Sequence, residues 1–206
     1  MPVDLADLVG GGRAAVLTME LQRGVVGDLS SFPELAAAVR DGGVIAHTTR
    51  LLAAARAAGV PVVHCTAGFR PDRRGSATNA PLIAAMLRRP EHLVEDTPAV
   101  DIIPELGVSP GDLVSHRRSG VSPFVGTSLD PTLRALGVST VVATGVSVNL
   151  GIVGLAIEAV DLGYRVVVAT DAVAGVPLDY ADAVVRHTLA LVAKLATTDE
   201  IAVAFS

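Results

Sequence analysis

The sequence predicts an α/β fold, a three-layer doubly wound arrangement in which a mostly parallel sheet carries helices on both faces. Short Val-rich apolar runs alternate along the chain with longer segments of helical periodicity. One segment, 138–173, has the pattern strand, tight turn, helix, strand, and such a crossover joins parallel strands. Half of the 206 residues are apolar and only 3% are aromatic, so the core must be aliphatic.

The first half of the chain supplies two of the expected strands. Ser30 or Ser31 is a candidate cap for the first long helix, Gly42 and Gly43 can interrupt it, and Gly59 can end it. A polar loop separates the second strand from a short helix. The expected elements are a strand over 13–19, a helix over 33–58, a strand over 60–65 and a helix over 81–88.

The second half continues the alternation. Gly163 ends the helix of the crossover, and Asp179 with Asp182 resembles a capping pair at the start of a long helix. No internal repeat or linker is visible, so residues 1–206 are expected to form one domain. The expected elements are strands over 113–116, 138–143, 165–169 and, at the edge, 201–205, with helices over 131–136, 152–160 and from 179.

Composition excludes several classes of function. A net charge of −5 gives no electrostatic reason to bind nucleic acid or anionic membranes. No apolar run is long enough to cross a bilayer, and the first residues lack the pattern of a signal peptide. A single cysteine, Cys65, rules out an intramolecular disulfide, and we expect a cytoplasmic protein.

Several motifs together suggest a family. They are TGV at 144–146, Gly-Tyr at 163–164, Asp-Ala at 171–172 and Ser-Pro-Phe at 122–124. With these motifs the chain resembles the isochorismatase-like hydrolases, also called the cysteine hydrolase superfamily, over about 13–205. The resemblance implies a six-stranded sheet of order 3-2-1-4-5-6 and a homodimer or homotetramer. It also implies a nucleophilic cysteine at position 151, where this chain has Gly151.

Two further positions of the family's site are also changed. The resemblance implies an Asp after the first strand, where this chain has Glu20, followed by Gln22. It implies a Lys before the Ser-Pro-Phe motif, and counting back from that motif gives Arg118, with His116 or Arg117 as alternatives if the loop is longer. An arginine stays protonated, so it cannot act as an acid or base, but it can clamp a carboxylate.

The turn after TGV is the third part of the expected site. The resemblance implies a peptide bond between Val146 and Ser147 that is often cis, and turn amides that stabilise an oxyanion. Gly151 leaves space and backbone N–H groups at the start of a helix. Substrate-binding residues are expected at Gln22, Phe69, Phe124, Val146, Ser147 and Asn149.

These substitutions shape the predicted chemistry. Members that cleave the vinyl ether of isochorismate also carry Gly at this position and need no covalent intermediate. We therefore expect a hydrolase of a small anionic molecule, with Glu20 as acid or base, Arg118 as anion clamp, and no metal or other cofactor. An arginine beside Glu20 would oppose a role as proton donor, because it favours the ionised carboxylate. Two alternatives stay open: a catalytically inactive small-molecule binder, and a hydrolase that uses Cys65.

Overall fold

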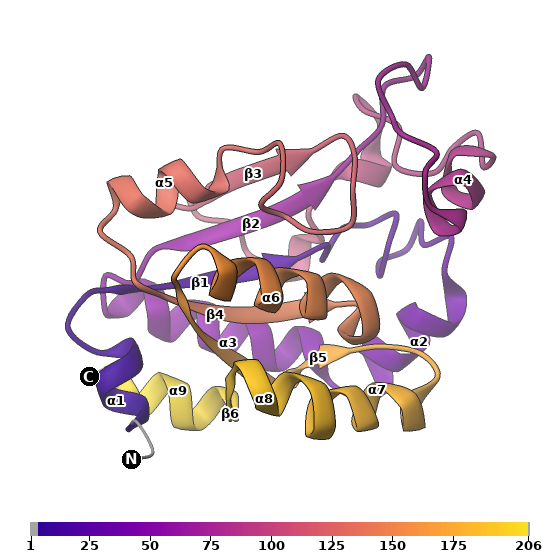
Figure 1. The fold of residues 1–206 in the computed structure, drawn as a ribbon. Coiled ribbons are helices and arrows are strands. Elements are labelled where there is room, and N and C mark those ends of the chain that lie inside the picture. The colour runs from indigo at the N-terminus through magenta and orange to yellow at the C-terminus, as the bar shows by residue number, and fades with distance from the viewer. Residues whose placement is uncertain (1–3, 206) are drawn as a thin grey trace.

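A computed structural model describes residues 4–205 and shows a six-stranded sheet of order β3-β2-β1-β4-β5-β6, with every neighbouring pair parallel (Figure 1). This is the predicted order. The strands are β1 (Ala14–Met19), β2 (Val62–Ala67), β3 (Leu113–Arg117), β4 (Thr140–Val146), β5 (Arg165–Ala174) and β6 (Lys194–Ala196).

Helices cover both faces of this sheet. One face carries α1 (Leu5–Val9), α2 (Pro33–Asp41), α3 (Val44–Ala57) and α9 (Thr198–Ala204). The other carries α5 (Leu129–Ala135), α6 (Val153–Asp161), α7 (Leu178–Val184) and α8 (Ala190–Val192), with π-helical turns at Val148–Ile152 and Val185–Leu189. The short helix α4 (Pro81–Leu87) stands apart, on the side where the strands end (Figure 1).

The sheet is buried on both faces, which explains its continuous apolar runs. Every residue of β1 is buried, and its alternate side chains enter two separate cores. Val16 packs toward α3, whereas Leu17 packs toward α6. Both cores are built almost entirely from Val, Leu, Ile and Ala, as the composition predicts.

The long helix expected over 33–58 is broken where its two glycines predict. Gly43 adopts a left-handed conformation with a φ of 64°, between the end of α2 and the start of α3. The expected serine cap is wrong, because Phe32 occupies the N-cap position and no side chain caps α2. The hydroxyl of Ser30 accepts a hydrogen bond from the Phe32 N–H instead.

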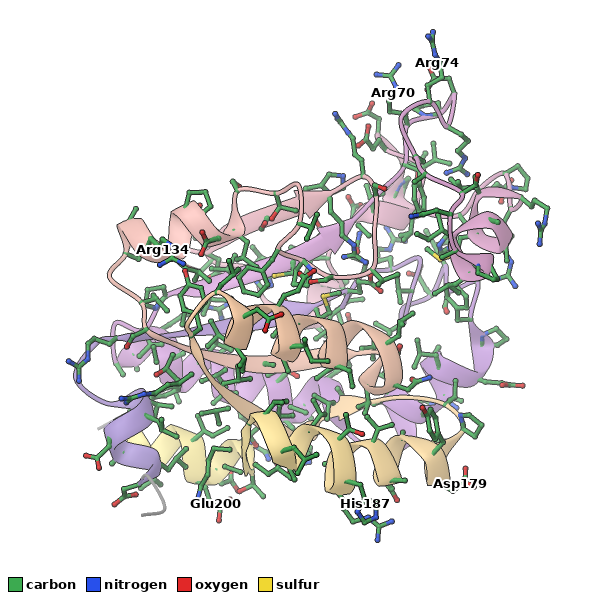
Figure 2. The ribbon with its side chains drawn as sticks, viewed as in Figure 1. Arg70, Arg74, Arg134, Asp179, His187 and Glu200 are labelled. Carbon is green, nitrogen blue, oxygen red and sulfur yellow. The ribbon has the colours of Figure 1, made fainter. Side chains whose placement is uncertain are left out.

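The end of the chain corrects two predictions. The segment expected as an edge strand over 201–205 lies in α9, because Thr197 and Glu200 form a reciprocal capping box that starts a helix there. The edge strand is β6, a few residues earlier. Asp179 does not cap α7 either: Pro177 is the N-cap, and Asp179, on the surface in Figure 2, accepts from the N–H of Tyr180.

None of the helices within residues 4–205 is both long and apolar enough to cross a membrane.

Candidate active site

Glu20 stands at the carboxyl end of β1, directly after Met19. Its backbone is left-handed, with a φ of 51°, which is uncommon for a residue with a side chain. Its N–H donates to the carbonyl of Cys65 on the neighbouring strand over 2.9 Å. This geometry turns the chain away from the sheet, and the Glu20 side chain remains 18% exposed. Residues held in such sparsely populated conformations cluster at functional sites.

Arg117, the last residue of β3, holds the Glu20 carboxylate. Its Nη2 donates to Glu20 Oε1, and its Nε donates to the carbonyl of Gly120 over 3.3 Å. The side chain is only 5% exposed, and its Nη1 is buried without a hydrogen-bond partner in the described part of the chain. Burial lowers the pKa of Arg117 to about 10, so the guanidinium still carries its charge at neutral pH.

Arg118, the residue expected beside Glu20, lies elsewhere. Its side chain is 62% exposed and pairs with Glu95. His116 also reaches Glu95, with 3.2 Å between Nε2 and Oε1. Successive residues of a strand point to opposite sides, so Arg117 faces Glu20 while its two neighbours do not. The placement predicted for Arg118 is corrected to Arg117, one of the two alternatives left open.

The turn after β4 has the cis peptide bond between Val146 and Ser147 that the family resemblance implies. The carbonyl of Ser147 accepts from the N–H groups of Leu150 and Ile152, over 3.2 and 3.0 Å. These two amides are therefore not available to an oxyanion. Asn149 donates through Nδ2 to the carbonyl of Val176 over 3.4 Å, and its buried Oδ1 has no hydrogen-bond partner among the residues that the structure describes.

Gly151 sits tightly against the backbone of this turn. A Cβ atom placed on it would lie 2.9 Å from the Val146 carbonyl oxygen and 3.2 Å from Cε of Met19. The first of these separations is too short for a real Cβ, so the backbone would have to move. Glycine is therefore the residue that this packing admits, and a cysteine would not fit here without a shift.

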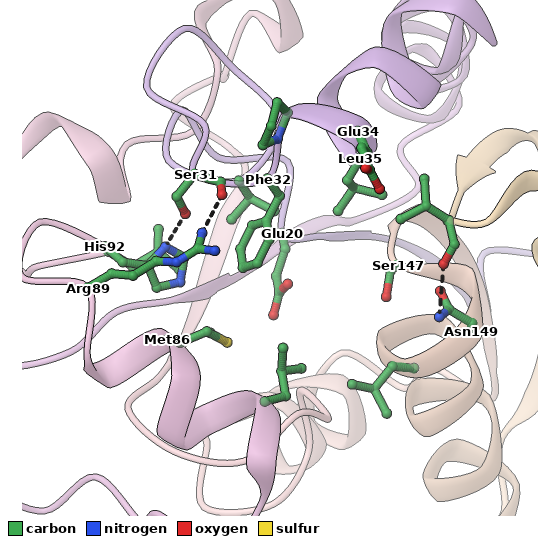
Figure 3. Close-up of a pocket in the computed structure, with 16 residues that line it drawn as sticks. Glu20, Ser31, Phe32, Glu34, Leu35, Met86, Arg89, His92, Ser147 and Asn149 are labelled. Carbon is green, nitrogen blue, oxygen red and sulfur yellow. Dashed lines mark hydrogen bonds between the residues drawn. The ribbon is translucent and has the colours of Figure 1, made fainter.

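A cavity of about 420 Å³ opens in front of Glu20 (Figure 3). Glu20, Ser147 and Asn149 supply polar groups at one end. A second polar group, Ser31, Arg89 and His92, lines the opposite end. Between them the wall is mostly apolar, and includes Phe32, Leu35, Leu82, Met86, Leu93 and Val176.

The residues of the second polar end of the cavity were not predicted from the sequence. His92 lies between α4 and the first short 3₁₀ turn (Pro98–Val100), and its Nδ1 is 2.7 Å from the Ser31 hydroxyl. Burial, with smaller contributions from the charges of Arg89 and Arg73, lowers the pKa of His92 to about 4, so its ring is neutral at neutral pH. No motif marks these residues; their segments meet only in the folded chain.

Four residues expected to bind substrate lie in the scaffold instead of lining this cavity. Gln22 is fully buried: its amide exchanges two 2.8 Å hydrogen bonds with the backbone of Ala67 and makes a third to Val100. Phe69 is buried in the core on the α3 side. Phe124 stacks on Tyr164, with 6.0 Å between ring centroids. Val146, also expected to bind substrate, is buried beneath the turn.

Cys65 has the environment of a structural cysteine. It is 1% exposed, and burial raises the pKa of its thiol to about 12. A nucleophile must reach its substrate as a thiolate, which this setting disfavours. His64 faces the other side of the strand, as expected, where Thr18 and Asp112 bond its two ring nitrogens over 2.8 and 3.2 Å.

Metal ligation has no visible basis in the part of the chain that the structure describes. No three His, Cys, Asp or Glu side chains gather there in a way that could hold an ion.

Comparison with known proteins identifies the class. The family model of the isochorismatase domain matches residues 14–200, so the chain belongs to the isochorismatase family. It is 37% identical over 101 residues to the isochorismatase family protein YwoC of Bacillus subtilis (48% of this chain, 52% of YwoC). It is 36% identical over 120 residues to ureidoacrylate amidohydrolase RutB of Methylobacterium radiotolerans (53% of this chain, 46% of RutB). These alignments span about half of each relative.

A solved structure supports the same fold over nearly the whole chain. An isochorismatase family protein from Burkholderia thailandensis superposes with a TM-score of 0.77 and 28% identity, covering 95% of this chain and 96% of that one.

Proposed function

We propose that this protein is an isochorismatase-family hydrolase that acts on a small anionic molecule without a covalent enzyme intermediate. The observation that carries the proposal is the Glu20 carboxylate, which lines the cavity of about 420 Å³ and is held from behind by the buried Arg117. Cys65 does not line this cavity, and position 151 has no side chain. No thiol therefore reaches the substrate, and the nucleophile in this proposal is water.

The ion pair favours one of the two roles expected for Glu20. A carboxylate paired with a guanidinium accepts protons, so Glu20 acts as a general base toward water. It takes a proton as the water oxygen bonds to the electrophilic carbon of the substrate, and returns that proton to the leaving group as the old bond breaks. Arg117 keeps the carboxylate in position, and its unpartnered Nη1 offers a further N–H beside it.

Two bond types are candidates for hydrolysis. An amide-type bond is supported by the similarity to RutB, whose name describes a ureidoacrylate amidohydrolase. A vinyl ether is supported by Gly151, because the family members that cleave isochorismate share this glycine. Its carbon accepts water only after a proton has been added to the double bond, however, and an ionised Glu20 paired with Arg117 does not readily supply that proton. The base mechanism therefore applies to the amide-type bond. In both cases the substrate has a compact body that fits the mostly apolar middle of the cavity.

Turnover of isochorismate and ureidoacrylate by the wild type and by Glu20→Gln tests the proposal. The variant keeps the shape of the side chain and removes the base, so we expect turnover to fall about 100-fold or more. Glu95→Gln is a matched control, because Glu95 also pairs with an arginine but does not line the cavity. Equal turnover in the wild type and Glu20→Gln would refute the base role, and saturable binding without any product would favour the inactive binder.

A further inference from the structure

The end of the cavity opposite Glu20 has a charge pattern that the proposed reaction does not use. Ser31 comes from the loop before α2, whereas Arg89 and His92 follow α4. Figure 3 shows these three side chains together on one side of the cavity, with Phe32 between them and Glu20. Segments far apart in the sequence thus form one polar group at the far end of a mostly apolar space.

His92 presents an unpartnered donor at this end. The residue is 4% exposed, and its ring packs edge-on against Phe32, with 5.2 Å between centroids. When the Ser31 hydroxyl donates to Nδ1, the neutral ring carries its hydrogen on Nε2. Nε2 is buried and has no hydrogen-bond partner among residues 4–205. A buried polar atom of this kind is normally satisfied, so it indicates a place for a ligand atom.

Arg89 adds a positive charge beside this donor. Its guanidinium lies over the Phe32 ring, 5.2 Å from the centroid, and its Nη1 donates to the carbonyl of Ser31. Arg73 lies behind, where it donates to the carbonyls of Arg89, Pro90 and His92. Among the described residues, neither arginine has a carboxylate within 4.0 Å. Arg89 therefore brings a positive charge to this end of the cavity, with Arg73 behind it, and the hydrogen-bond partners of both are neutral carbonyls.

The acidic residues of the cavity do not compensate this charge. Glu20 is paired with Arg117 at the opposite end. Glu34 is an exposed residue of α2 and is drawn beside Leu35, on the side of the cavity away from Arg89, in Figure 3. A negatively charged group of a ligand bound at this end of the cavity would balance the excess positive charge.

We propose that Arg89 and the Nε2–H of His92 bind a carboxylate of the substrate and thereby direct the rest of the molecule toward Glu20. The identification of this carboxylate as part of a substrate rests on the proposed function. A planar, singly charged carboxylate suits one guanidinium and one imidazole donor. Anion recognition is thus assigned to the end of the cavity opposite Glu20, and not to the exposed Arg118.

Binding of benzoate and of its neutral analogue benzamide, measured by calorimetry, tests this assignment without any turnover. We expect benzoate to bind the wild type at least about tenfold more tightly than benzamide, because one hydrogen bond to a charged group changes affinity by about this factor. Arg89→Met should weaken benzoate about tenfold and leave benzamide unchanged, and Arg89→Lys should restore part of the loss. Arg88→Met is the matched control, since Arg88 is adjacent, exposed and outside the cavity wall.

Further variants separate this proposal from the proposed function. His92→Phe preserves the aromatic packing and should also weaken benzoate, provided that its thermal unfolding shows an intact fold. Glu20→Gln should leave benzoate affinity unchanged whatever it does to turnover. Each of four outcomes would overturn the assignment. Two are equal benzoate affinity in Arg89→Met and wild type, and equal affinity of the wild type for benzoate and benzamide. The others are tighter binding of inorganic phosphate than of benzoate, and a tenfold rise in benzoate affinity in Glu20→Gln.

Discussion

Arg117 and Glu20 lie 97 positions apart in the sequence and form an ion pair at the carboxyl edge of the sheet. The pair spans β2, because the strand order places β3 and β1 on either side of it. Arg117 is the more deeply buried partner, and within residues 4–205 the only other hydrogen bond of its side chain is to the carbonyl of Gly120. The charge at the base of the cavity therefore depends on contact between two elements distant in sequence.

Removing Arg117 should destabilise the protein strongly. Arg117→Met leaves the Glu20 carboxylate without its partner in a largely buried position, and we expect a loss of roughly 3 kcal/mol in the free energy of unfolding. The double variant with Glu20→Gln should recover part of that loss, because it removes the uncompensated charge. Urea denaturation of the single and double variants measures both effects.

Arg118→Met is the control for this prediction. Arg118 is 62% exposed, and without it Glu95 keeps His116 as a partner over 3.2 Å, so the loss should stay below about 1 kcal/mol. Equal destabilisation by the two substitutions would contradict the assignment of the buried ion pair to Arg117.

The glycine at position 151 should be a packing requirement. Gly151→Ala places a Cβ 2.9 Å from the Val146 carbonyl oxygen, and the forced backbone shift should cost about 1–3 kcal/mol in unfolding free energy. Gly154→Ala, three residues on in α6, meets nothing closer than 3.6 Å and should be neutral or stabilising by about 0.5–1 kcal/mol. Thermal or urea unfolding of this pair tests the difference, and equal stabilities would refute it.

The same geometry predicts the result of restoring the family's usual residue. Gly151→Cys should lower stability as Gly151→Ala does, and should give no covalent adduct with the substrates, because the surrounding backbone is packed for glycine. Mass spectrometry of the variant after incubation with ureidoacrylate detects such an adduct, and its appearance would show that the turn adapts.

The sequence predicted the strand-end residues of the site but not the opposite wall. Glu20 and Ser147 follow apolar strands, and parallel topology brings strand ends to one edge. The choice between Arg117 and Arg118 depended on one residue of loop length, which a residue count does not determine. His92 and Phe32 come from irregular segments without a motif, so only tertiary packing brings them together.

Two predictions about helices and strands were wrong because of residues at the ends of helices. The run Ile-Ala-Val-Ala-Phe at 201–205 is apolar and short, and such runs fit a strand or a buried helix equally well. The capping box of Thr197 and Glu200 decided the outcome, and this signal was present in the sequence. For α7, the carboxylates of Asp179 and Asp182 suggested a cap, but the chain enters the helix through Pro177.

Cys65 should not take part in hydrolysis. Its thiol is buried and has a pKa raised to about 12, so iodoacetamide should modify it only after unfolding. Cys65→Ala should retain turnover and lose about 1 kcal/mol of stability through the small space left behind. Rapid alkylation of the native protein, or loss of turnover in Cys65→Ala with an intact fold, would instead support the hydrolase that uses Cys65.

His92 should make stability depend on pH in a defined window. Its pKa in the folded protein is about 4, below the ordinary value of 6.5, because of burial and the charges of Arg89 and Arg73. Between these values the unfolded chain binds a proton that the folded chain does not. The contribution of His92 to the free energy of unfolding is therefore fully present above pH 6.5 and decreases as the pH drops toward 4. Below pH 4 it changes no further, and the whole decrease amounts to up to about 3 kcal/mol.

The difference between wild type and His92→Phe isolates this contribution, since other titrating groups, including the buried His64, are common to both proteins. Urea denaturation at intervals from pH 4 to 7.5 should show wild-type stability falling more steeply with acidification than that of His92→Phe. His187→Gln removes an exposed imidazole on the far surface (Figure 2) and controls for the loss of a histidine as such. Parallel pH profiles of wild type and His92→Phe would mean that His92 is not held neutral in the fold. The donor role proposed for its Nε2 would then lose its basis, because a ring that titrates freely is open to water.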